Sequence, residues 1–326
     1  MIPFNTHEEL ISILICSRDR RKDLEHLTTE LKQIAFDRTL EIVVVEETDE
    51  PVSIDSVRYV SHPVANRGIP YARNLALSNA NGKIIVFLDD DCLIHENWLD
   101  NLLMPFQDDS IVGVQGGVCV PEETNSIGWA ESILGIPGGG ILRIYKAKGK
   151  VQETREISTL NCAYRRWVVN KVGGFEKQLK ITGEDYLLAK QVCNYGRCVF
   201  VPDAMVSHKA RGNLLNIWHW FVRRGRAEID VIQTGKQKDT TLWTVLRSSL
   251  FVKLLFLILI ATVFTGQLVF LTLAFMSVYT LLQLARYYGA WRFSGAPIQA
   301  LVLLPVVKVT MDIAMDWGRF RGMIFD

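Results

Sequence analysis

Three consecutive aspartates, Asp89, Asp90 and Asp91, directly follow the apolar run Ile84–Leu88. Like charges at such close range repel one another, so a buried strand that ends in them needs a compensating partner. Carboxylate oxygens suit Mg²⁺ or Mn²⁺, which typically bind one or two protein carboxylates together with substrate phosphate oxygens. We therefore predict a divalent cation that bridges a diphosphate at these aspartates. A solvated turn that caps the next helix is the alternative.

Two further features carry groups that could do chemistry. Glu184 and Asp185 precede the helical pattern "YLLAK", where acidic residues are favoured by the helix dipole even without any catalytic role. A carboxylate at this place could also serve as a general base. His208 follows a short predicted strand, and a lone histidine is most often a structural surface residue, although a neutral imidazole is also a metal ligand. The residues alone leave both alternatives open.

The elements that position these groups follow from an alternation of apolar runs and amphipathic patterns in the first 120 residues. We expect strands at residues 10–16, 40–47, 58–62 and 83–89, and helices at 24–34, 66–80 and 95–106. Fully apolar strands that alternate with amphipathic helices are typical of an α/β protein whose parallel sheet is covered on both faces. Ligands of such sheets bind outside the carboxyl ends of the strands. The polar residues that close the strands should therefore meet at one rim: Ser17, Arg18 and Asp19, Glu46 and Glu47, and Asp89, Asp90 and Asp91.

Composition excludes some classes of function. The chain has 326 residues and a formal net charge of +1, so it presents no overall excess of positive charge for a nucleic acid. Its six cysteines contain no C-x-x-C pair, which favours reduced, buried thiols in a cytosolic compartment over disulfides or a zinc site. The first residues show no signal-peptide pattern.

Six segments in order resemble the family 2 glycosyltransferases over roughly residues 10 to 230. They are "ISILICSRDR", "EIVVVEE", "NRGIPYARNLAL", "FLDDDC", "NCAYRRWVVNKVGGFE" and "GEDYLLAKQVCNYG". The resemblance implies the Rossmann-like, A-type nucleotide-sugar-binding fold (GT-A) with a mostly parallel sheet.

The resemblance also implies how the donor is bound. Asp89 would face the nucleotide ribose and share the metal with Asp91, and Asp90 would occupy the variable position between them. His208 would be a further metal ligand. Arg73, in "ARN", would face the diphosphate.

The same resemblance assigns the nucleotide base to two segments. Glu46 would read the base, although the family usually has aspartate there, and the loop with Ser17 and Arg18 would wrap it.

On the acceptor side, the resemblance makes Asp185 the base that deprotonates the acceptor hydroxyl. A single in-line displacement then inverts the anomeric configuration. Glu184 would orient the base or the acceptor, and Asn161 would lie near the acceptor-side edge of the sheet. Gly173 and Gly174 would form a tight turn that brings backbone close to the sugar.

Residues 214–231 combine aromatic and basic side chains. We expect an amphipathic segment at the lipid headgroups, with Trp218, Trp220 and Phe221 inserted and Arg223 and Arg224 on phosphates. The polymerising synthases that the family contains carry Gln-x-x-Arg-Trp near this point, and this chain has "VRRGRA" instead.

After a linker at 231–244, residues 245–326 form a predicted membrane-associated helical region. The apolar run 250–282 is too long for one span of ~30 Å at ~1.5 Å per residue and is interrupted at Thr265–Gln267, which indicates a hairpin. Basic residues at both outer ends place these ends in the cytoplasm. In residues 297–322, Lys308, Asp312 and Asp316 recur every four positions, so we expect a helix that lies on the membrane surface or is partly inserted and packs under the catalytic domain.

The sequence thus predicts an inverting, Mg²⁺- or Mn²⁺-dependent glycosyltransferase of the cell membrane with a cytoplasmic catalytic domain. The donor would be a nucleotide-diphosphate sugar. The acceptor would be lipid-linked, including a polyprenyl phosphate, and no nucleic acid is expected as a partner. A polysaccharide synthase and a non-catalytic, nucleotide-sugar-binding membrane subunit are the alternatives.

Overall fold

The chain folds into two compact units in a computed structural model that describes residues 9–34, 39–65, 67–179, 182–235, 250–265 and 269–324. Unit 1 consists of Met1–Pro121 and Ala147–Lys209, and unit 2 of Glu122–Lys146 and Ala210–Asp326. Residues 122–146, which lie inside the predicted catalytic domain, therefore group with the C-terminal helices.

Unit 1 is built on one mixed sheet, to which nine strands of the described residues belong. They are β1 (Ile11–Arg18), β2 (Leu40–Glu47), β3 (Arg58–His62), β4 (Ile84–Asp89), β5 (Cys92–Ile94), β6 (Ile111–Cys119), β7 (Gln152–Glu153), β8 (Asn161–Arg165) and β9 (Arg197–His208). The order is β3-β2-β1-β4-β8-β6-β9-β5, and β7 pairs with β9. Strands β1 to β4 are mutually parallel as expected, whereas β8 runs antiparallel between β4 and β6.

Helices cover both faces of this sheet. They are α1 (Arg21–Ile34), α2 (Ile69–Ser78), α3 (Trp98–Leu103), α6 (Arg166–Val172) and α7 (Glu184–Val192), with a 3₁₀ turn at Met104–Gln107. Successive strand residues point to opposite faces, so Ile13 packs in one core with Leu24 of α1, and Leu14 packs in the other with Ala76 of α2. The two-sided α/β layering predicted from the apolar strands is confirmed.

The order of the strands reverses at β1, which lies between β2 and β4. The register places Cys16 beside Asp89, and Ser17 beside Glu46. A crevice opens at such a reversal, outside the carboxyl ends of the strands, and is where open α/β sheets bind ligands. The predicted rim of polar residues is therefore centred on this point.

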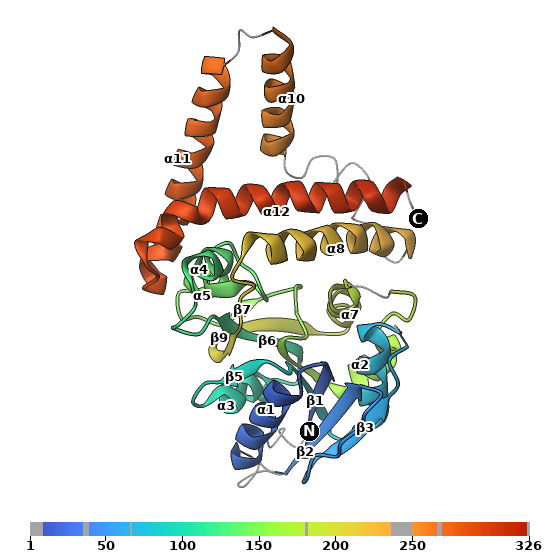
Figure 1. The fold of residues 1–326 in the computed structure, drawn as a ribbon. Coiled ribbons are helices and arrows are strands. Elements are labelled where there is room, and N and C mark those ends of the chain that lie inside the picture. Colours follow the sequence, from blue (N-terminus) through green and yellow to red (C-terminus); the bar gives the residue numbers. More distant parts are fainter. Residues whose placement is uncertain are drawn as a thin grey trace. The chain divides into compact units, whose positions relative to one another are not determined.

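Unit 2 is helical. It contains α4 (Ser126–Ile133), α5 (Gly140–Ala147), α8 (Leu214–Gln233), α10 (Leu250–Thr265), α11 (Val269–Ser294) and α12 (Ile298–Ile324). Within this unit α10 and α11 lie side by side, and α12 runs across their base beside α8 (Figure 1). By length and composition, α11 and α12 could each cross a membrane, and α10 is a shorter apolar helix.

The two helices α10 and α11 agree with the predicted hairpin, and residues 266–268 between them lie outside the described residues. So do residues 236–249, which hold most of the predicted linker and the expected start of the hairpin at 245. One detail differs from expectation. Arg286 and Arg292 lie inside α11 rather than after it, because the helix continues to Ser294.

Candidate active site

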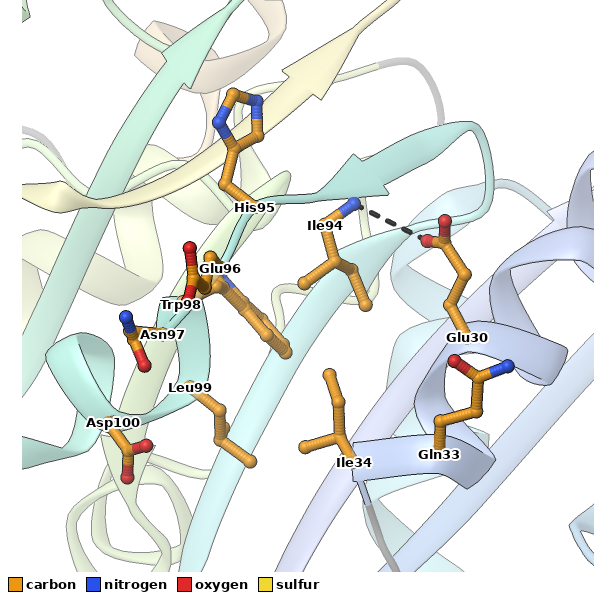
Figure 2. Close-up of a pocket in the computed structure, with 10 residues that line it drawn as sticks. All are labelled: Glu30, Gln33, Ile34, Ile94, His95, Glu96, Asn97, Trp98, Leu99 and Asp100. Atoms are coloured by element: carbon orange, nitrogen blue, oxygen red, sulfur yellow. Dashed lines mark hydrogen bonds between the residues drawn. The ribbon is translucent and has the colours of Figure 1, made fainter.

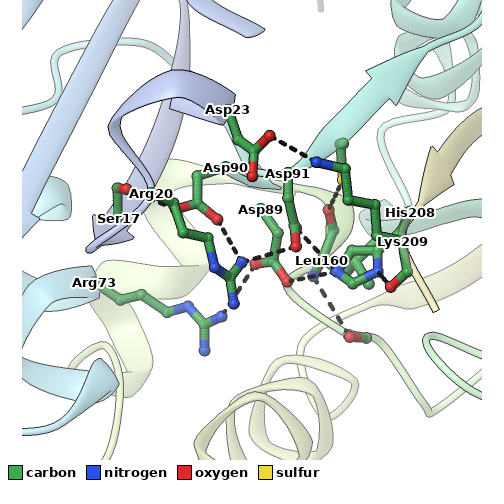
Figure 3. Close-up of polar contacts among 12 residues, drawn as sticks. Ser17, Arg20, Asp23, Arg73, Asp89, Asp90, Asp91, Leu160, His208 and Lys209 are labelled. Atoms are coloured by element: carbon green, nitrogen blue, oxygen red, sulfur yellow. Dashed lines mark hydrogen bonds and ion pairs between the residues drawn. The ribbon is translucent and has the colours of Figure 1, made fainter. Parts of the chain in front are cut away.

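Cations hold the three aspartates together (Figure 3). Arg20 Nη1 lies 2.8 Å from both Asp90 Oδ1 and Asp91 Oδ2, and Ser17 Oγ donates a hydrogen bond of 2.6 Å to Asp90 Oδ2. Arg20 stands where α1 begins, directly after β1, so the turn at the switch point brings it to the end of β4. It supplies the compensating charge that the three aspartates require, and the sequence pattern had not singled it out.

His208 joins this cluster through the sheet. Strand β5 follows the aspartates and pairs antiparallel with β9, which places Cys92 opposite His208. The imidazole Nε2 therefore lies 3.0 Å from Asp91 Oδ1 and 4.0 Å from Asp89 Oδ2 (Figure 3). Two carboxylates and one imidazole converge as the predicted metal ligands would.

Burial and charge act differently on the neighbouring carboxyls. Burial raises the pKa of Asp90 to about 6, although Ser17 and Arg20 oppose the rise. Burial also disfavours ionised Asp91, but the proximity of His208 and Arg20 outweighs it and leaves the pKa of Asp91 below its usual value. Asp91 is thus the carboxyl of this pair that is more readily ionised at neutral pH.

The donor set fits a divalent cation of the Mg²⁺ or Mn²⁺ type. Within the described residues, the neighbour of the buried Asp91 Oδ1 is His208 Nε2 at 3.0 Å, which does not form a hydrogen bond of regular geometry with it. No group of three or more His, Cys, Asp or Glu side chains among those residues is arranged to hold a metal ion without further ligands. Mg²⁺ and Mn²⁺ sites that use substrate phosphates need no such group, because one or two protein carboxylates are sufficient. Asp89, Asp91 and His208 would hold the ion.

Arg73 of α2 links the aspartates to the second acidic motif. Its guanidinium forms an ion pair with Glu184 and lies 3.6 Å from Asp89 Oδ1. Glu184 is 2% exposed, and burial raises the pKa of its carboxyl, against which Arg73 acts. The structure therefore brings together Asp89, Arg73 and Glu184 from three separate elements, as a donor site beside a base would require.

Asp185 lies next to this pair, in the first turn of α7. It is partly exposed, and its Oδ1 accepts a hydrogen bond of 2.8 Å from the backbone N–H of Tyr186. Gly183 at the start of the helix has a φ of 96°, a conformation that favours glycine. An accessible carboxylate at this place could accept a proton.

The glycine turn after α6 is held by α2. The Asn74 amide exchanges two hydrogen bonds of 2.9 Å with the backbone of Phe175, and a Cβ on Gly174 would lie 2.6 Å from Asn74 Oδ1. The backbone of this turn therefore lies close to Asn74. The predicted approach to a sugar stays a prediction.

The residues expected at the nucleotide base have partners of their own. Glu46 is 5% exposed and accepts hydrogen bonds from Tyr59 Oη at 2.6 Å and from Arg21 Nη1 at 3.1 Å. Arg18 lies 3.4 Å from Glu47 Oε2. Both stand at the carboxyl ends of β1 and β2, so their place at the rim agrees with expectation, and their role in binding a base stays a prediction.

Asn161 does not lie at a sheet edge. Strand β8 is in the interior of the sheet, and the Asn161 side chain is fully buried. It accepts a hydrogen bond from Trp98 Nε1 and donates to the carbonyls of Gly117 and Ala204. The resemblance placed Asn161 near the acceptor-side edge of the sheet, and this position is wrong because β8 lies between β4 and β6.

In unit 2, α8 carries the predicted aromatic and basic residues. Arg223 and Arg224 are exposed and Trp218 and Trp220 are partly buried, but Phe221 is 7% exposed. Phe221 therefore packs inside the unit rather than among lipids. Trp220 stacks with Arg211 at 3.8 Å and with Arg224 at 5.2 Å, and Arg211 forms an ion pair with the buried Glu131 of α4.

A separate pocket of about 390 Å³ lies in unit 1 between α1 and α3. Its wall includes Glu30, Ile34, Ile94, His95 and Asp100 (Figure 2). None of the predicted site residues lines it, so it is distinct from the cluster at the switch point.

All six cysteines are free, and Cys92, Cys162 and Cys198 are buried, whereas the other three are partly exposed. Their reduced state stays a prediction. Four other residues that matter to the geometry were not expected from the sequence: Arg20, Arg21, Tyr59 and Arg211. Arg20 and Arg21 could have been identified from the sequence, because both belong to the polar turn that follows the first strand.

Comparison with known proteins gives the class and then the family. A mannosyltransferase, PcManGT from Pyrobaculum calidifontis solved in complex with GDP-Man and Mn²⁺, has a TM-score of 0.57 and 16% sequence identity to this chain, covering 99% of this chain and 90% of that one. This likeness and the mixed sheet define a GT-A-like fold. Residues 12–173 match the profile of glycosyl transferase family 2, so the chain carries a domain of that family.

Two curated proteins are similar over part of the chain. A pre-mycofactocin glycosyltransferase of Mycobacterium tuberculosis is 26% identical over 226 residues, 66% of this chain and 45% of that protein. A glucosyl-dolichyl phosphate glucuronosyltransferase of Haloferax volcanii is 23% identical over 155 residues, 44% of this chain and 48% of that protein. The chain spans about half the length of the curated relatives it matches.

Proposed function

We propose that this protein transfers a sugar from a nucleotide-diphosphate donor to a lipid-linked acceptor, with inversion at the anomeric carbon. The observation that carries the proposal is that His208 Nε2 lies 3.0 Å from Asp91 and 4.0 Å from Asp89 at the switch point. Arg73 connects this cluster to the Glu184–Asp185 motif, because it contacts both Asp89 and Glu184. The family assignment and the GT-A-like fold support it.

On the donor side, the diphosphate would lie against the aspartates and Arg73. A divalent cation bound there would neutralise charge on the departing nucleotide diphosphate. Arg73 supplies a fixed positive charge at the same place, and its pair with Glu184 restricts how far it can move. PcManGT, whose fold is similar, was solved with GDP-Man and Mn²⁺, and this supports a nucleotide-diphosphate sugar and a divalent cation as the ligand classes here.

On the acceptor side, Asp185 would accept the proton of the attacking hydroxyl. The carbon–oxygen bond to the acceptor forms as the bond to the nucleotide diphosphate breaks, so one displacement inverts the configuration without a covalent sugar–enzyme intermediate. If the acceptor is a polyprenyl phosphate, its oxygen is already ionised and Asp185 would orient it. Glu184 is buried and paired, so it would position Arg73 and the helix start rather than take the proton.

The acceptor is proposed to be lipid-linked because unit 2 offers a membrane surface. Large apolar side chains of the hairpin are exposed, including Val263 at 81%, Phe264 at 84% and Phe270 at 86%. The exposed Arg223 and Arg224 on α8 suit lipid phosphate, and the name of one relative includes a dolichyl phosphate. The protein would thus be held in the cell membrane with its catalytic unit in the cytoplasm.

The experiment is a panel of nucleotide sugars offered to the purified full-length protein with Mn²⁺ and a polyprenyl-phosphate acceptor. We expect nucleoside diphosphate to be released with one donor, and the product to have the opposite anomeric configuration by NMR. If a donor binds but no sugar is transferred to the acceptor offered, the alternative of a non-catalytic subunit is favoured. A long-chain product would favour a polysaccharide synthase.

A further inference from the structure

One face of α12 is an apolar stripe with no protein cover among the described residues. Its exposed members are spaced by three, four or seven residues, so they lie on one side of the helix. They are Val302, Val306, Ile313, Trp317, Phe320 and Ile324, whose side chains are between 42% and 66% exposed. Isolated exposed apolar residues are ordinary, but a continuous row along most of a 27-residue helix indicates an interaction surface.

The opposite face of α12 is pressed against α8. A Cβ on Gly318 would clash with the Val222 carbonyl oxygen, and a Cβ on Gly225 would clash with the Met315 carbonyl oxygen. Glycine on each helix therefore lets the two backbones touch. Helices packed this closely move as one body.

Ion pairs along the sides of α12 also connect it to α8 and α10. Asp316 lies 2.7 Å from Arg319 and 3.3 Å from Lys253 of α10, and Arg319 Nε lies 2.6 Å from Glu228 of α8. The stripe of Lys308, Asp312 and Asp316 expected from the sequence is present, and Lys308 pairs with Asp312. Lys308, Asp312, Asp316 and Arg319 of α12 thus pair within unit 2, whereas the apolar stripe faces outward.

The charges of α8 decide where this pair of helices can lie. Between Arg223 and Asp230, α8 carries Arg223, Arg224, Arg226, Glu228 and Asp230. One charged side chain at the centre of a bilayer disfavours insertion on the order of 100-fold. By length and composition α12 could cross a membrane. To do so, it would have to carry the charged helix α8 into the bilayer or lose the close contacts at Gly225 and Gly318.

We propose that α12 lies in the plane of the membrane surface, with its apolar stripe in the acyl-chain boundary, and that the C-terminus stays on the side of the catalytic unit. At ~1.5 Å per residue, α12 would cover about 40 Å of the surface. The hairpin α10–α11 alone would insert, and α8 would lie at the headgroups with its arginines. The inference rests on the membrane association proposed above and adds its topology.

The first experiment locates both ends of the full-length protein. Epitope tags are added at the N-terminus and after Asp326, and intact and opened membrane vesicles are treated with protease. We expect both tags to be cleaved, or both protected, in vesicles of one orientation. Opposite protection of the two tags would mean that α12 crosses the membrane and would overturn the proposal. Recovery of the protein without membranes would instead refute membrane association itself.

The second experiment compares matched charged substitutions. Ile313 in α12 and Met276 in α11 are 42% and 47% exposed. In Ile313→Lys the ammonium can reach the headgroups from an in-plane helix, so we expect at least half of the wild-type amount in alkali-washed membranes. In Met276→Lys the charge must enter the hydrocarbon, so we expect a loss of more than fivefold. Equal losses in the two variants would contradict an in-plane α12.

Discussion

Arg73 on α2 and Glu184 on α7 form a buried ion pair although 111 positions separate them in the chain. The same guanidinium lies 3.6 Å from Asp89, so one side chain touches both acidic motifs. A bound diphosphate would approach the aspartates beside a cation that is already attached to the neighbour of the proposed base. If the proposed donor site is right, binding of the diphosphate would act on Arg73 and, through Glu184, on the start of α7 where Asp185 lies.

This relationship predicts a stability effect for Glu184→Gln. Removing one partner of a buried pair leaves the other charge uncompensated and costs roughly 3 kcal/mol. We expect the melting temperature in detergent to fall by on the order of 5–10 °C. Asp185→Asn is the matched control, since it changes the next residue, which is partly exposed, and should leave the melting temperature nearly unchanged. Equal melting temperatures for Glu184→Gln and wild type would show that the pair contributes nothing.

The metal assignment predicts the effect of Asp91→Asn. The substitution retains size and removes the charge that would bind the cation, so Mn²⁺- or Mg²⁺-dependent turnover should fall at least ~100-fold with an unchanged circular dichroism spectrum. Excess EDTA should abolish wild-type activity, and added Mn²⁺ should restore it. Full activity of the variant, or of wild type in EDTA, would mean that these carboxylates serve another purpose.

A substitution of Asp185 distinguishes a role in catalysis from a role in donor binding. Asp185→Asn should lower kcat by roughly 10² to 10⁴ for a hydroxyl acceptor, because no base then takes the proton. Donor affinity, measured by calorimetry with a nucleoside diphosphate and Mn²⁺, should stay within a factor of three of wild type. If affinity collapses together with turnover, Asp185 belongs to the donor site.

Arg20 should matter most when no ligand is bound. It is the cation that contacts both Asp90 and Asp91, so Arg20→Ala should lower the melting temperature of the protein in EDTA. Mn²⁺ with nucleoside diphosphate would replace the missing charge, and the ligand-induced rise in melting temperature should be larger in the variant than in wild type. Arg197→Ala, which removes exposed ion pairs with Asp108 and Glu153, is the control and should show the wild-type rise. An equal rise in all three proteins would exclude this role.

The arginines of α8 test the lipid acceptor. The combined change Arg223→Ala and Arg224→Ala should reduce transfer to a polyprenyl-phosphate acceptor at least tenfold, because two charge-assisted contacts to phosphate are lost. Donor binding and recovery in the membrane fraction should persist. The matched control is Arg286→Ala with Arg292→Ala, which removes the same charge from α11. If both double variants transfer normally, Arg223 and Arg224 are ordinary headgroup contacts.

Local patterns were sufficient for the elements and for part of the site. Residues 40–47 and 58–62 form strands with the predicted bounds, because β-branched apolar runs flanked by polar turns have few alternatives. The rim of Ser17, Glu46 and Asp89–Asp91 also followed, since parallel strands that precede helices end at the same edge. The family resemblance added the order of the motifs.

Only the tertiary structure decided which distant side chains meet. The resemblance placed Asn161 near an edge of the sheet, but it is buried because β8 inserts antiparallel beside β4. His208 reaches Asp91 through the pairing of β5 with β9, and Arg73 reaches Glu184 because α2 and α7 cover the same face of the sheet. Phe221 looked lipid-facing, but the tertiary structure buries it. Sequence periodicity shows which face of an element is apolar, whereas the partner of that face depends on long-range pairing that no local pattern records.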